Sequence, residues 1–468
     1  MVKDLSNIDL LCIGSGPAGQ RAAVQAAKLG KRVVVVEKRR VVGGVCVDTG
    51  TIPSKTFREA ILAFGRQAAQ FRTRHGFTDT SRPTVTQLFA RVNEVMEREG
   101  QVVEQQLRRN DITMIRGEAS FLDAHTVQVV GDGITHRIRA RYCLIAVGTV
   151  PSPPRGIPRS RNLIITSDEV MTLEHIPRNI MVVGAGVIGL EYASMFAALV
   201  GVDVTLVDTR QWPLEFLDAE IVDELIHQMR NHDVTFRLGE TVERLELSGG
   251  SPQKAVMYLE SGKKLVADLV LFAVGRVGAT ETLRLSAAGL KADERGRLTV
   301  DECFRTVVPH IFAAGDVIGY PSLAATSSEQ GRLAACYAFQ VEATPMPSHF
   351  PIGIYAIPEI SMVGATEQAL TAEKVPYETG LARYREIARG QIMGDDSGLL
   401  KLLFHRDTRR LLGVHVIGSG ATELVHVGQA VLGLGGGLEY FLSTVFNYPT
   451  MAECYKVAAL DAFNKLSL

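Results

Sequence analysis

The sequence predicts an α/β fold in which one strand–turn–helix–strand unit occurs twice, followed by a C-terminal α+β unit. Two observations predict the repeat: a short apolar run leads into a glycine-rich turn at two places, and each time a second apolar run ends in an acid. A third observation predicts the last unit, because beyond about Phe350 the pattern changes to short runs typical of antiparallel strands. With 468 residues the chain is long enough for about two to four domains.

The first copy of the unit lies near the N-terminus. Its apolar run, Ile8 to Ile13, leads into the turn Gly14, Ser15, Gly16, Pro17, Ala18 and Gly19. We expect an alanine-rich helix from Arg21 to Leu29 and a buried strand from Val33 to Val36 that ends in Glu37. Glu37 stands 18 residues beyond Gly19. This spacing is typical of a dinucleotide site, where the pyrophosphate lies at the helix N-terminus and the acid binds a ribose hydroxyl.

The second copy has the same order. Ile180 to Val183 leads into the turn Gly184, Ala185, Gly186, Val187, Ile188 and Gly189, and a helix containing Glu191 follows. The strand Val202 to Val207 ends in Asp208, 19 residues beyond Gly189. One glycine turn is a weak signal, but two complete copies predict two dinucleotides bound by two domains.

Arg210 stands two residues after Asp208, where its cation could meet the 2′-phosphate of NADP. An acid and an arginine side by side would let one site take NAD or NADP. The alternative is that Arg210 is one solvated surface charge among many.

The segments around the two copies also have patterns that predict secondary structure. We expect a packing helix over Val85 to Arg109, a small hairpin within Ile112 to Ile138 and a buried strand over Cys143 to Ala146. Prolines at positions 151, 153 and 154 indicate a domain boundary. Later strands are expected over Leu269 to Val274, Leu399 to Phe404 and Leu411 to Val416.

Composition excludes several classes of protein. A formal net charge of -1 gives no electrostatic reason to expect nucleic acid or an anionic membrane as partner. Six cysteines without a Cys-x-x-Cys pair form no disulfide framework or zinc site, and the histidines have no metal-like spacing. The N-terminus has no signal cleavage site, and the longest apolar run, Ile180 to Leu190, is too short for a membrane span. We therefore expect a cytoplasmic protein without a metal.

The stretch Gly43-Gly44-Val45-Cys46-Val47-Asp48-Thr49-Gly50-Thr51-Ile52-Pro53-Ser54-Lys55 resembles the redox segment of the dihydrolipoamide dehydrogenase and glutathione reductase family. With the two glycine turns, the resemblance extends over essentially the whole chain. It implies an FAD domain in two parts, 1–150 and 275–348, an NAD(P) domain at 151–274, and a C-terminal domain at 349–468 that builds a homodimer.

Two departures from this family coincide. Thr51 stands where the second cysteine of the redox pair is expected, and Tyr448 stands where the acid–base histidine is expected. An unperturbed tyrosine, with a pKa of ~10, is a poorer base at working pH than a histidine near ~6.5. The two losses suggest a chemistry that needs hydride transfer and no thiol.

The departures Thr51 and Tyr448-Pro449-Thr450, together with Gly315 to Ser322, resemble the soluble pyridine nucleotide transhydrogenases. This resemblance implies reversible transfer of a hydride from NADPH to NAD+ through FAD, with NAD(H) and NADP(H) as substrates. The runner-up is an NAD(P)H-dependent quinone or dye reductase on the same scaffold. An alternative of another class is a non-catalytic, flavin-bound nucleotide sensor.

The resemblance also implies the site residues. Lys55 is expected near the flavin, paired with Glu191, and these two are the catalytic candidates. Thr306 to Asp316 resembles the second half of an FAD site, with Asp316 bonding the ribityl chain, whereas Cys46 is expected only to pack near the flavin. The residues expected at the cofactors are Gly14, Ser15, Gly16, Pro17, Ala18, Gly19, Glu37, Lys38, Gly43, Gly44, Val45, Cys46, Lys55, Gly117, Ala119, Ala146, Gly148, Gly184, Gly186, Val187, Ile188, Gly189, Asp208, Arg210, Gly275, Arg276, Gly315 and Asp316.

Overall fold

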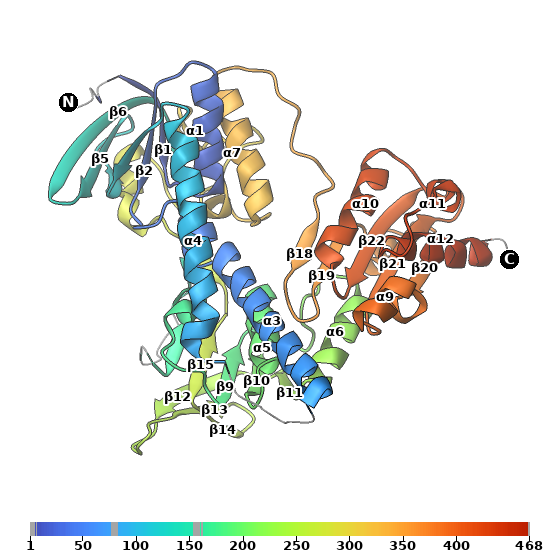
Figure 1. Cartoon of the computed structure of the whole chain (residues 1–468). Helices are drawn as coiled ribbons and strands as arrows, with labels where there is room; N and C mark the ends of the chain where they lie inside the picture. The colour runs from blue at the N-terminus through green and yellow to red at the C-terminus, as the bar shows by residue number, and fades with distance from the viewer. Residues whose placement is uncertain (1–4, 6, 76–82, 153–159, 161, 467–468) are drawn as a thin grey trace.

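The structure of the chain, a computed structural model, is described for residues 5, 7–75, 83–152, 160 and 162–466 (Figure 1). Its three largest sheets define three units. The first unit contains the sheet of β1 to β6 with β17, and the second unit contains the sheet of β8 to β11 with β15. The C-terminal unit contains the sheet of β18 to β22.

The sheet of the first unit is mixed, in the order β3-β2-β1-β6-β5-β4, and β17 also pairs with β6. Its strands are β1 Ile8–Ile13, β2 Val33–Glu37, β3 Thr113–Arg116, β4 Glu118–Phe121, β5 Thr126–Gly131, β6 Ile134–Ile145 and β17 Ile311–Ala313. β6 pairs in parallel with β1 and β17 over its last residues and antiparallel with β5 over its first. The return of the chain to this sheet at β17 means that the second unit is inserted into the first.

Two helices, α1 Pro17–Lys28 and α7 Ala324–Ala338, lie side by side against the first sheet (Figure 1). Small residues permit their close approach, because a Cβ atom at Gly331 would lie 2.0 Å from the carbonyl oxygen of Ala18. The long helices α3 Thr51–His75 and α4 Val85–Arg108 extend from the first unit to the second. The ring of Phe57 on α3 lies 6.1 Å from that of Phe196 on α5, which fixes the start of α3 against the second unit.

The sheet of the second unit is parallel, in the order β11-β10-β9-β15-β8. Its strands are β8 Ile164–Thr166, β9 Asn179–Val183, β10 Asp203–Asp208, β11 Val234–Leu238 and β15 Leu269–Phe272. Two helices belong to it, α5 Val187–Ala197 and α6 Ala219–Asn231. A small antiparallel sheet adds β12 Val242–Leu247, β13 Ala255–Leu259 and β14 Lys264–Ala267. The antiparallel pair β7 Thr149–Pro151 and β16 Arg276–Gly278 connects the two units.

The C-terminal unit is an antiparallel sheet, in the order β18-β19-β22-β21-β20. Its strands are β18 Ile352–Ile354, β19 Ile360–Gly364, β20 Tyr377–Arg383, β21 Leu399–His405 and β22 Leu411–Ile417. Its helices are α8 Glu367–Ala372, α9 Ala388–Met393, α10 Ala421–Gly433, α11 Leu438–Ser443 and α12 Glu453–Leu466. Short helical segments elsewhere are α2 Gly44–Asp48, η1 Ser167–Thr172, η2 Glu281–Leu283, η3 Leu285–Ala288, η4 Asp316–Ile318 and η5 Tyr384–Glu386.

Most expected elements are present with shifted ends. The helix expected over Val85 to Arg109 is α4, which begins after a capping box at Thr84. The hairpin expected within Ile112 to Ile138 is part of the three antiparallel strands β4, β5 and β6. Pro153 and Pro154, taken as a boundary signal, lie outside the described residues, while Pro151 ends β7.

Candidate functional site

The first glycine turn connects β1 to α1 at the edge where the parallel strands end. A Cβ atom at Gly14 would lie 2.3 Å from the carbonyl oxygen of Ala146, and one at Gly19 would lie 2.0 Å from that of Gly14. These two glycines are therefore required by backbone contacts within the protein. Gly16 is different, because no heavy atom lies within 4 Å of its ideal Cβ position. The open space in front of Gly16 leaves room for a phosphate at the start of α1.

Glu37, at the end of β2, is only 4% exposed and is held in a fixed orientation. Its Oε2 atom accepts hydrogen bonds from the Ser15 amide at 3.0 Å and the Ser15 hydroxyl at 2.5 Å. Its Oε1 atom accepts one from the Arg39 amide at 2.8 Å. The Ser15 hydroxyl in turn accepts a hydrogen bond from the Gly43 amide at 2.9 Å. The glycine turn, the acid and the Gly43 segment thus form one connected structure.

A cleft of about 1010 Å³, its open mouth included, lies where β1, β2 and β6 end. Its lining includes fifteen of the expected cofactor residues: Gly14, Gly16, Pro17, Ala18, Glu37, Lys38, Gly44, Val45, Cys46, Gly117, Ala119, Ala146, Gly148, Gly315 and Asp316. These residues come from segments that are far apart in the sequence. The first unit therefore brings most of its expected site residues to a single cleft.

The cleft fits FAD in shape and in chemistry. At Gly44, with a φ of 64°, a Cβ atom would lie 2.8 Å from the Cα atom of Gly16, so the two backbone segments can meet only without side chains. Asp316 also lines the cleft, and its carboxylate oxygens can accept hydrogen bonds from hydroxyl groups. Burial raises the pKa of Asp316 above its ordinary value, and the positive charge of Arg276 opposes that shift.

Other lining residues were not expected from the sequence. They are Ile13, Val36, Arg39, Thr51, Glu118, Val147, Ala279, Thr282, Leu283, Ala314, Ser322, Ala324 and Ser327. Several are direct neighbours of expected residues, so their place follows from the same motifs. Ala279, Thr282 and Leu283 have no local signal, because they follow β16 and reach the cleft only through the fold.

Cys46 lines the cleft beside Thr51, and all six cysteines are free. Burial raises the pKa of the Cys46 thiol above its ordinary value, and a hydrogen bond with Thr51 opposes the shift. At neutral pH the thiol therefore stays protonated. A protonated thiol without a sulfur partner is a poor nucleophile.

The second glycine turn repeats the geometry of the first. The Gly184 amide donates to Val207 at 2.8 Å, as the Gly14 amide donates to Val36 at 2.8 Å. The Ala185 amide donates to Asp208 Oδ2 at 2.5 Å, in the same way as the Ser15 amide donates to Glu37. Gly186, Val187, Ile188 and Gly189 form the turn and the start of α5. A second dinucleotide fits here by the same rules.

Arg210 lies directly against Asp208. Its amide and its Nε atom donate to Asp208 Oδ1 at 2.7 and 3.0 Å, and its Nη2 atom donates to Oδ2 at 2.8 Å. Burial alone would raise the pKa of Asp208, but the hydrogen bonds from Arg210 hold it below its ordinary value. With the Ala185 amide, the carboxylate has four hydrogen-bond donors in this structure. A ribose hydroxyl can bind Asp208 only when the Arg210 side chain moves away.

Gly275 and Arg276, expected at the cofactors, are not among the residues that line this cleft. The Arg276 guanidinium donates to the Thr149 hydroxyl and carbonyl, each at 2.9 Å, and to Asp168 at 2.8 Å. Thr149 lies on β7 and Asp168 in η1, so Arg276 connects the strand pair between the units with the second unit. The sequence pattern could not indicate this, because the partners are more than 100 residues away.

Lys55, near the start of α3, forms the expected ion pair with Glu191 of α5, with 2.6 Å between Nζ and Oε2. The Glu191 side chain is 5% exposed and that of Lys55 is 25% exposed. Glu191 Oε1 accepts a hydrogen bond from the amide of Tyr355 in the C-terminal unit at 2.8 Å. The Lys55 ammonium also lies 5.0 Å from the centre of the Tyr355 ring. Residues of all three units therefore meet at Glu191.

The C-terminal segment that resembles the histidine region lies largely on the surface. The Tyr448 side chain is exposed. The Glu453 Oε2 atom, at the start of α12, is buried and has no hydrogen-bond partner. Within the described residues this segment does not reach the cleft. Among the same residues, no helix is long and apolar enough to cross a membrane.

The two dinucleotide folds, the cleft and the junction at Glu191 define a flavin- and nicotinamide-dependent oxidoreductase scaffold. Residues 8–331 match the family described as pyridine nucleotide-disulphide oxidoreductase. Residues 350–459 match the dimerisation domain of the same family. The chain belongs to this family.

Relatives within the family carry a more particular name. A "Soluble pyridine nucleotide transhydrogenase" of Mycobacterium bovis is 48% identical over 460 residues, which cover 98% of this chain and 97% of the relative. A protein of the same name from Photobacterium profundum is 44% identical over 472 residues, covering 99% of each chain.

Solved structures of similar fold include two flavoproteins. The HOCl-induced flavoprotein disulfide reductase RclA from Escherichia coli has a TM-score of 0.86 at 26% identity, covering 97% of this chain and 99% of that one. LpdA from Mycobacterium tuberculosis has a TM-score of 0.87 at 25% identity, with the same coverage.

Proposed function

We propose that the protein is an FAD-dependent NAD(P)+ transhydrogenase that reversibly transfers a hydride from NADPH to NAD+. The observation that carries the proposal is the state of Cys46. It lies in the cofactor cleft with a protonated thiol and no sulfur partner, while both dinucleotide folds and the Lys55–Glu191 pair are intact. The names of the relatives at 48% and 44% identity support the same activity.

The first unit supplies the FAD site. The flavin, when bound, supplies the ring that takes up and gives back the hydride. Glu37 is placed to hold a ribose hydroxyl, and the open backbone at Gly16 to receive the pyrophosphate. We assign Asp316 a hydrogen bond to the ribityl chain, and its place in the lining of the cleft supports this role. Cys46 and Thr51 form part of the wall and need no chemical role.

Lys55 holds a positive charge at the junction of the units. Its ion pair with the nearly buried Glu191 fixes the ammonium group, so little reorganisation is needed when negative charge develops nearby. Glu191 is itself fixed by the Tyr355 amide. We assign Lys55 an electrostatic role and Glu191 the role of orienting it.

The second unit binds one nicotinamide nucleotide at a time. Asp208 suits the free ribose hydroxyls of NAD(H), whereas Arg210 suits the 2′-phosphate of NADP(H). Because the two side chains are bonded to each other in this structure, each ligand must engage one of them and release the other. The same site can thus accept both substrates in turn.

The wider organisation is proposed on the same basis. We assign 1–150 and 275–348 to the FAD domain, 151–274 to the NAD(P) domain and 349–468 to the C-terminal domain, and the sheet order supports this division. The protein forms a homodimer through the C-terminal domain, as the match to a dimerisation domain supports. A cytoplasmic location is supported by the relatives, whose name includes the word soluble.

An anaerobic comparison of acceptors tests the proposed activity. NADPH is supplied with an NAD+ analogue of distinct absorbance, with a quinone or with lipoamide. We expect the nucleotide analogue to be reduced fastest at low concentration and lipoamide not to be reduced. Equal or faster turnover of quinone would favour a quinone reductase. Turnover of lipoamide would indicate that the protein is a disulfide reductase.

A further inference from the structure

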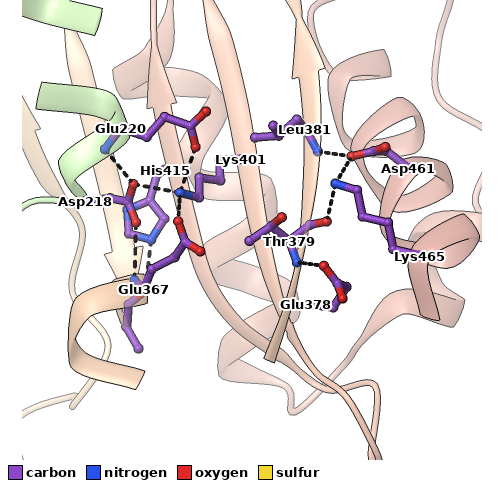
Figure 2. A network of polar contacts seen from close by, with 11 residues as sticks. Asp218, Glu220, Glu367, Glu378, Thr379, Leu381, Lys401, His415, Asp461 and Lys465 are labelled. Atoms are coloured by element: carbon purple, nitrogen blue, oxygen red, sulfur yellow. Dashed lines mark hydrogen bonds and ion pairs between the residues drawn. The ribbon is translucent and has the colours of Figure 1, made fainter. Parts of the chain in front are cut away.

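A buried lysine joins the second unit to the C-terminal unit (Figure 2). Lys401, on β21, has no exposed side-chain surface. Its Nζ atom lies 2.9 Å from Asp218 Oδ1 and 2.9 Å from Glu220 Oε2, and it also pairs with Glu367 Oε2. Asp218 and Glu220 belong to the start of α6 in the second unit, whereas Glu367 begins α8 of the C-terminal unit. The contacts of one ammonium group therefore cross the boundary between the units.

The three carboxylates do not form an empty metal site. One oxygen of each lies within 4.8 Å of the others, a geometry that could hold a cation. However, the Lys401 ammonium already bonds all three and takes the cation's place. Burial alone would lower the pKa of Lys401, but hydrogen bonds to Glu367 and Asp218 raise it above its ordinary value. Lys401 therefore stays charged.

Backbone amides extend the cluster on both sides of the boundary. The Asp218 carboxylate accepts from the Glu220 amide at 3.2 Å, which caps α6, and from the Glu367 amide at 3.3 Å, across the boundary. His415 lies opposite Lys401 in the β21–β22 pair and donates its Nε2–H to the Ala365 carbonyl at 2.9 Å. Burial lowers the pKa of His415, so the ring is neutral and adds no second cation. The cluster is thus an organised hydrogen-bond network around a single ammonium.

Apolar side chains also pack across the boundary between the two units. Leu399 and Ile417, on the same sheet, belong to one apolar cluster with Ile221 and Leu225 of α6. Apolar contact is non-directional, and a well-packed apolar residue is often as stabilising as a buried ion pair. The three hydrogen bonds of Lys401 are directional. They therefore contribute more to the relative orientation of the two units than to the strength of the contact between them.

The second unit has another contact with the C-terminal unit, close to the Lys55–Glu191 pair. There the Tyr355 amide donates to Glu191 at 2.8 Å, and the Ile357 amide donates to the Ser194 hydroxyl at 2.9 Å. Both acceptors lie on α5, whereas the Lys401 contact is on α6. Two polar contacts on different helices therefore restrict the orientation of the second unit relative to the C-terminal unit.

We propose that Lys401 is a positioning residue that fixes the orientation of the nucleotide-binding unit toward the flavin cleft. This inference rests on the proposed function only in that a nicotinamide bound to the second unit must reach the first. A misplacement of about 1 Å can cost about a hundredfold in rate. Lys401 then affects the rate of hydride transfer for either nucleotide, because both are held by the same unit.

The test uses the holoenzyme of Lys401→Met. At saturating NADPH or NADH, we expect the anaerobic rate of flavin reduction to fall by about tenfold or more for both nucleotides. Nucleotide dissociation constants should stay within about twofold, because the recognition residues remain in place. Independently of activity, hydrogen–deuterium exchange should become faster at the start of α6 and of α8, where the Glu220 and Glu367 amides bond Asp218.

A matched control and a second variant make the test decisive. Lys465→Met removes a lysine that bonds Asp461 at 2.7 Å and Thr379 at 3.0 Å within the C-terminal unit, and it should leave the rate unchanged (Figure 2). If Lys401→Met does not fold, the triple variant Lys401→Met, Glu220→Gln, Glu367→Gln removes two of the three uncompensated charges and leaves Asp218 with its two amide donors; it should show the same loss of rate. Unchanged flavin reduction in a folded, FAD-loaded variant would overturn the proposal, and so would a loss confined to NADPH. Flavin reduction does not depend on the final acceptor, so this test is separate from that of the transhydrogenase activity.

Discussion

At the scale of single residues, the two acids that end β2 and β10 show how one motif serves two sites. Glu37 and Asp208 each accept a hydrogen bond from the first amide inside the preceding glycine turn, Ser15 or Ala185. They differ in their other partners. A backbone amide and a serine hydroxyl complete the bonds of Glu37, whereas the partly exposed side chain of Arg210 covers Asp208. The first site therefore suits a permanent cofactor, and the second suits substrates that exchange.

The Arg210 side chain should discriminate between the two nucleotides. In Arg210→Ala, we expect the dissociation constant for NADPH to rise at least about tenfold, because a charge-assisted hydrogen bond to the 2′-phosphate contributes about 1.5–3 kcal/mol. The constant for NADH should stay the same or fall, since Asp208 loses a partner that competes with the ribose. Both constants can be measured by anaerobic titration of the holoenzyme.

Arg244→Ala is the matched control for this change. Arg244 belongs to the same unit and pairs with Glu246 at 3.1 Å on the surface, on the small antiparallel sheet. It should alter neither constant. Equal weakening of NADPH and NADH in Arg210→Ala would show that Arg210 is not a ligand of the 2′-phosphate.

At the scale of secondary-structure elements, the sequence predicts those features that depend on local patterns. Each strand–turn–helix–strand copy lies within about 30 residues, where periodicity and glycine spacing are direct signals. Hydrogen bonds and ion pairs between distant elements could not be predicted in this way. Lys401 and Asp218 are 183 residues apart, and nothing near either indicates the other. The only local signal is a lysine within the apolar strand Leu399–His405, which implies a buried partner without identifying it.

The paired turns allow a test of which fold binds which cofactor. A Cβ atom added at Gly19 would lie 2.0 Å from the carbonyl oxygen of Gly14. One added at Gly189 would lie 1.8 Å from the carbonyl oxygen of Gly184. Gly19→Ala should therefore open the first turn and yield protein with reduced FAD content. Gly189→Ala should keep its FAD but weaken NADPH and NADH alike by about tenfold or more, since overpacking typically costs about 1–3 kcal/mol.

FAD content is measured by absorbance after purification, and nucleotide affinity by titration. Gly433→Ala is the control, because no heavy atom lies within 4 Å of its ideal Cβ position. It should preserve both properties. Loss of FAD in Gly189→Ala together with full retention in Gly19→Ala would reverse the assignment of the two folds.

At the scale of the whole molecule, the three units meet at the proposed catalytic pair. Lys55 from the first unit, Glu191 from the second and the Tyr355 amide from the C-terminal unit form one bonded set. Lys401 supplies a second contact between the last two units. The arrangement holds a nucleotide site and a flavin cleft in one orientation without any disulfide between the units, since all six cysteines are free. Electron transfer between the sites therefore depends on geometry, and sulfur is not needed as a relay.

The absence of a sulfur relay predicts how many electrons the molecule stores. Anaerobic titration should reach its end point at two electrons per bound FAD, because a redox-active disulfide would store two more. Burial raises the pKa of the thiols of Cys12, Cys143, Cys336 and Cys454, as it does for Cys46, which disfavours the thiolates that form disulfides. Cys46→Ala should give the same end point and keep most of the transhydrogenase rate, since a packing change at this site costs about 1 kcal/mol, less than a tenfold effect. A four-electron end point in the wild-type protein that falls to two in Cys46→Ala would mean that Cys46 finds a sulfur partner during turnover, and the hydride-only mechanism would then be wrong.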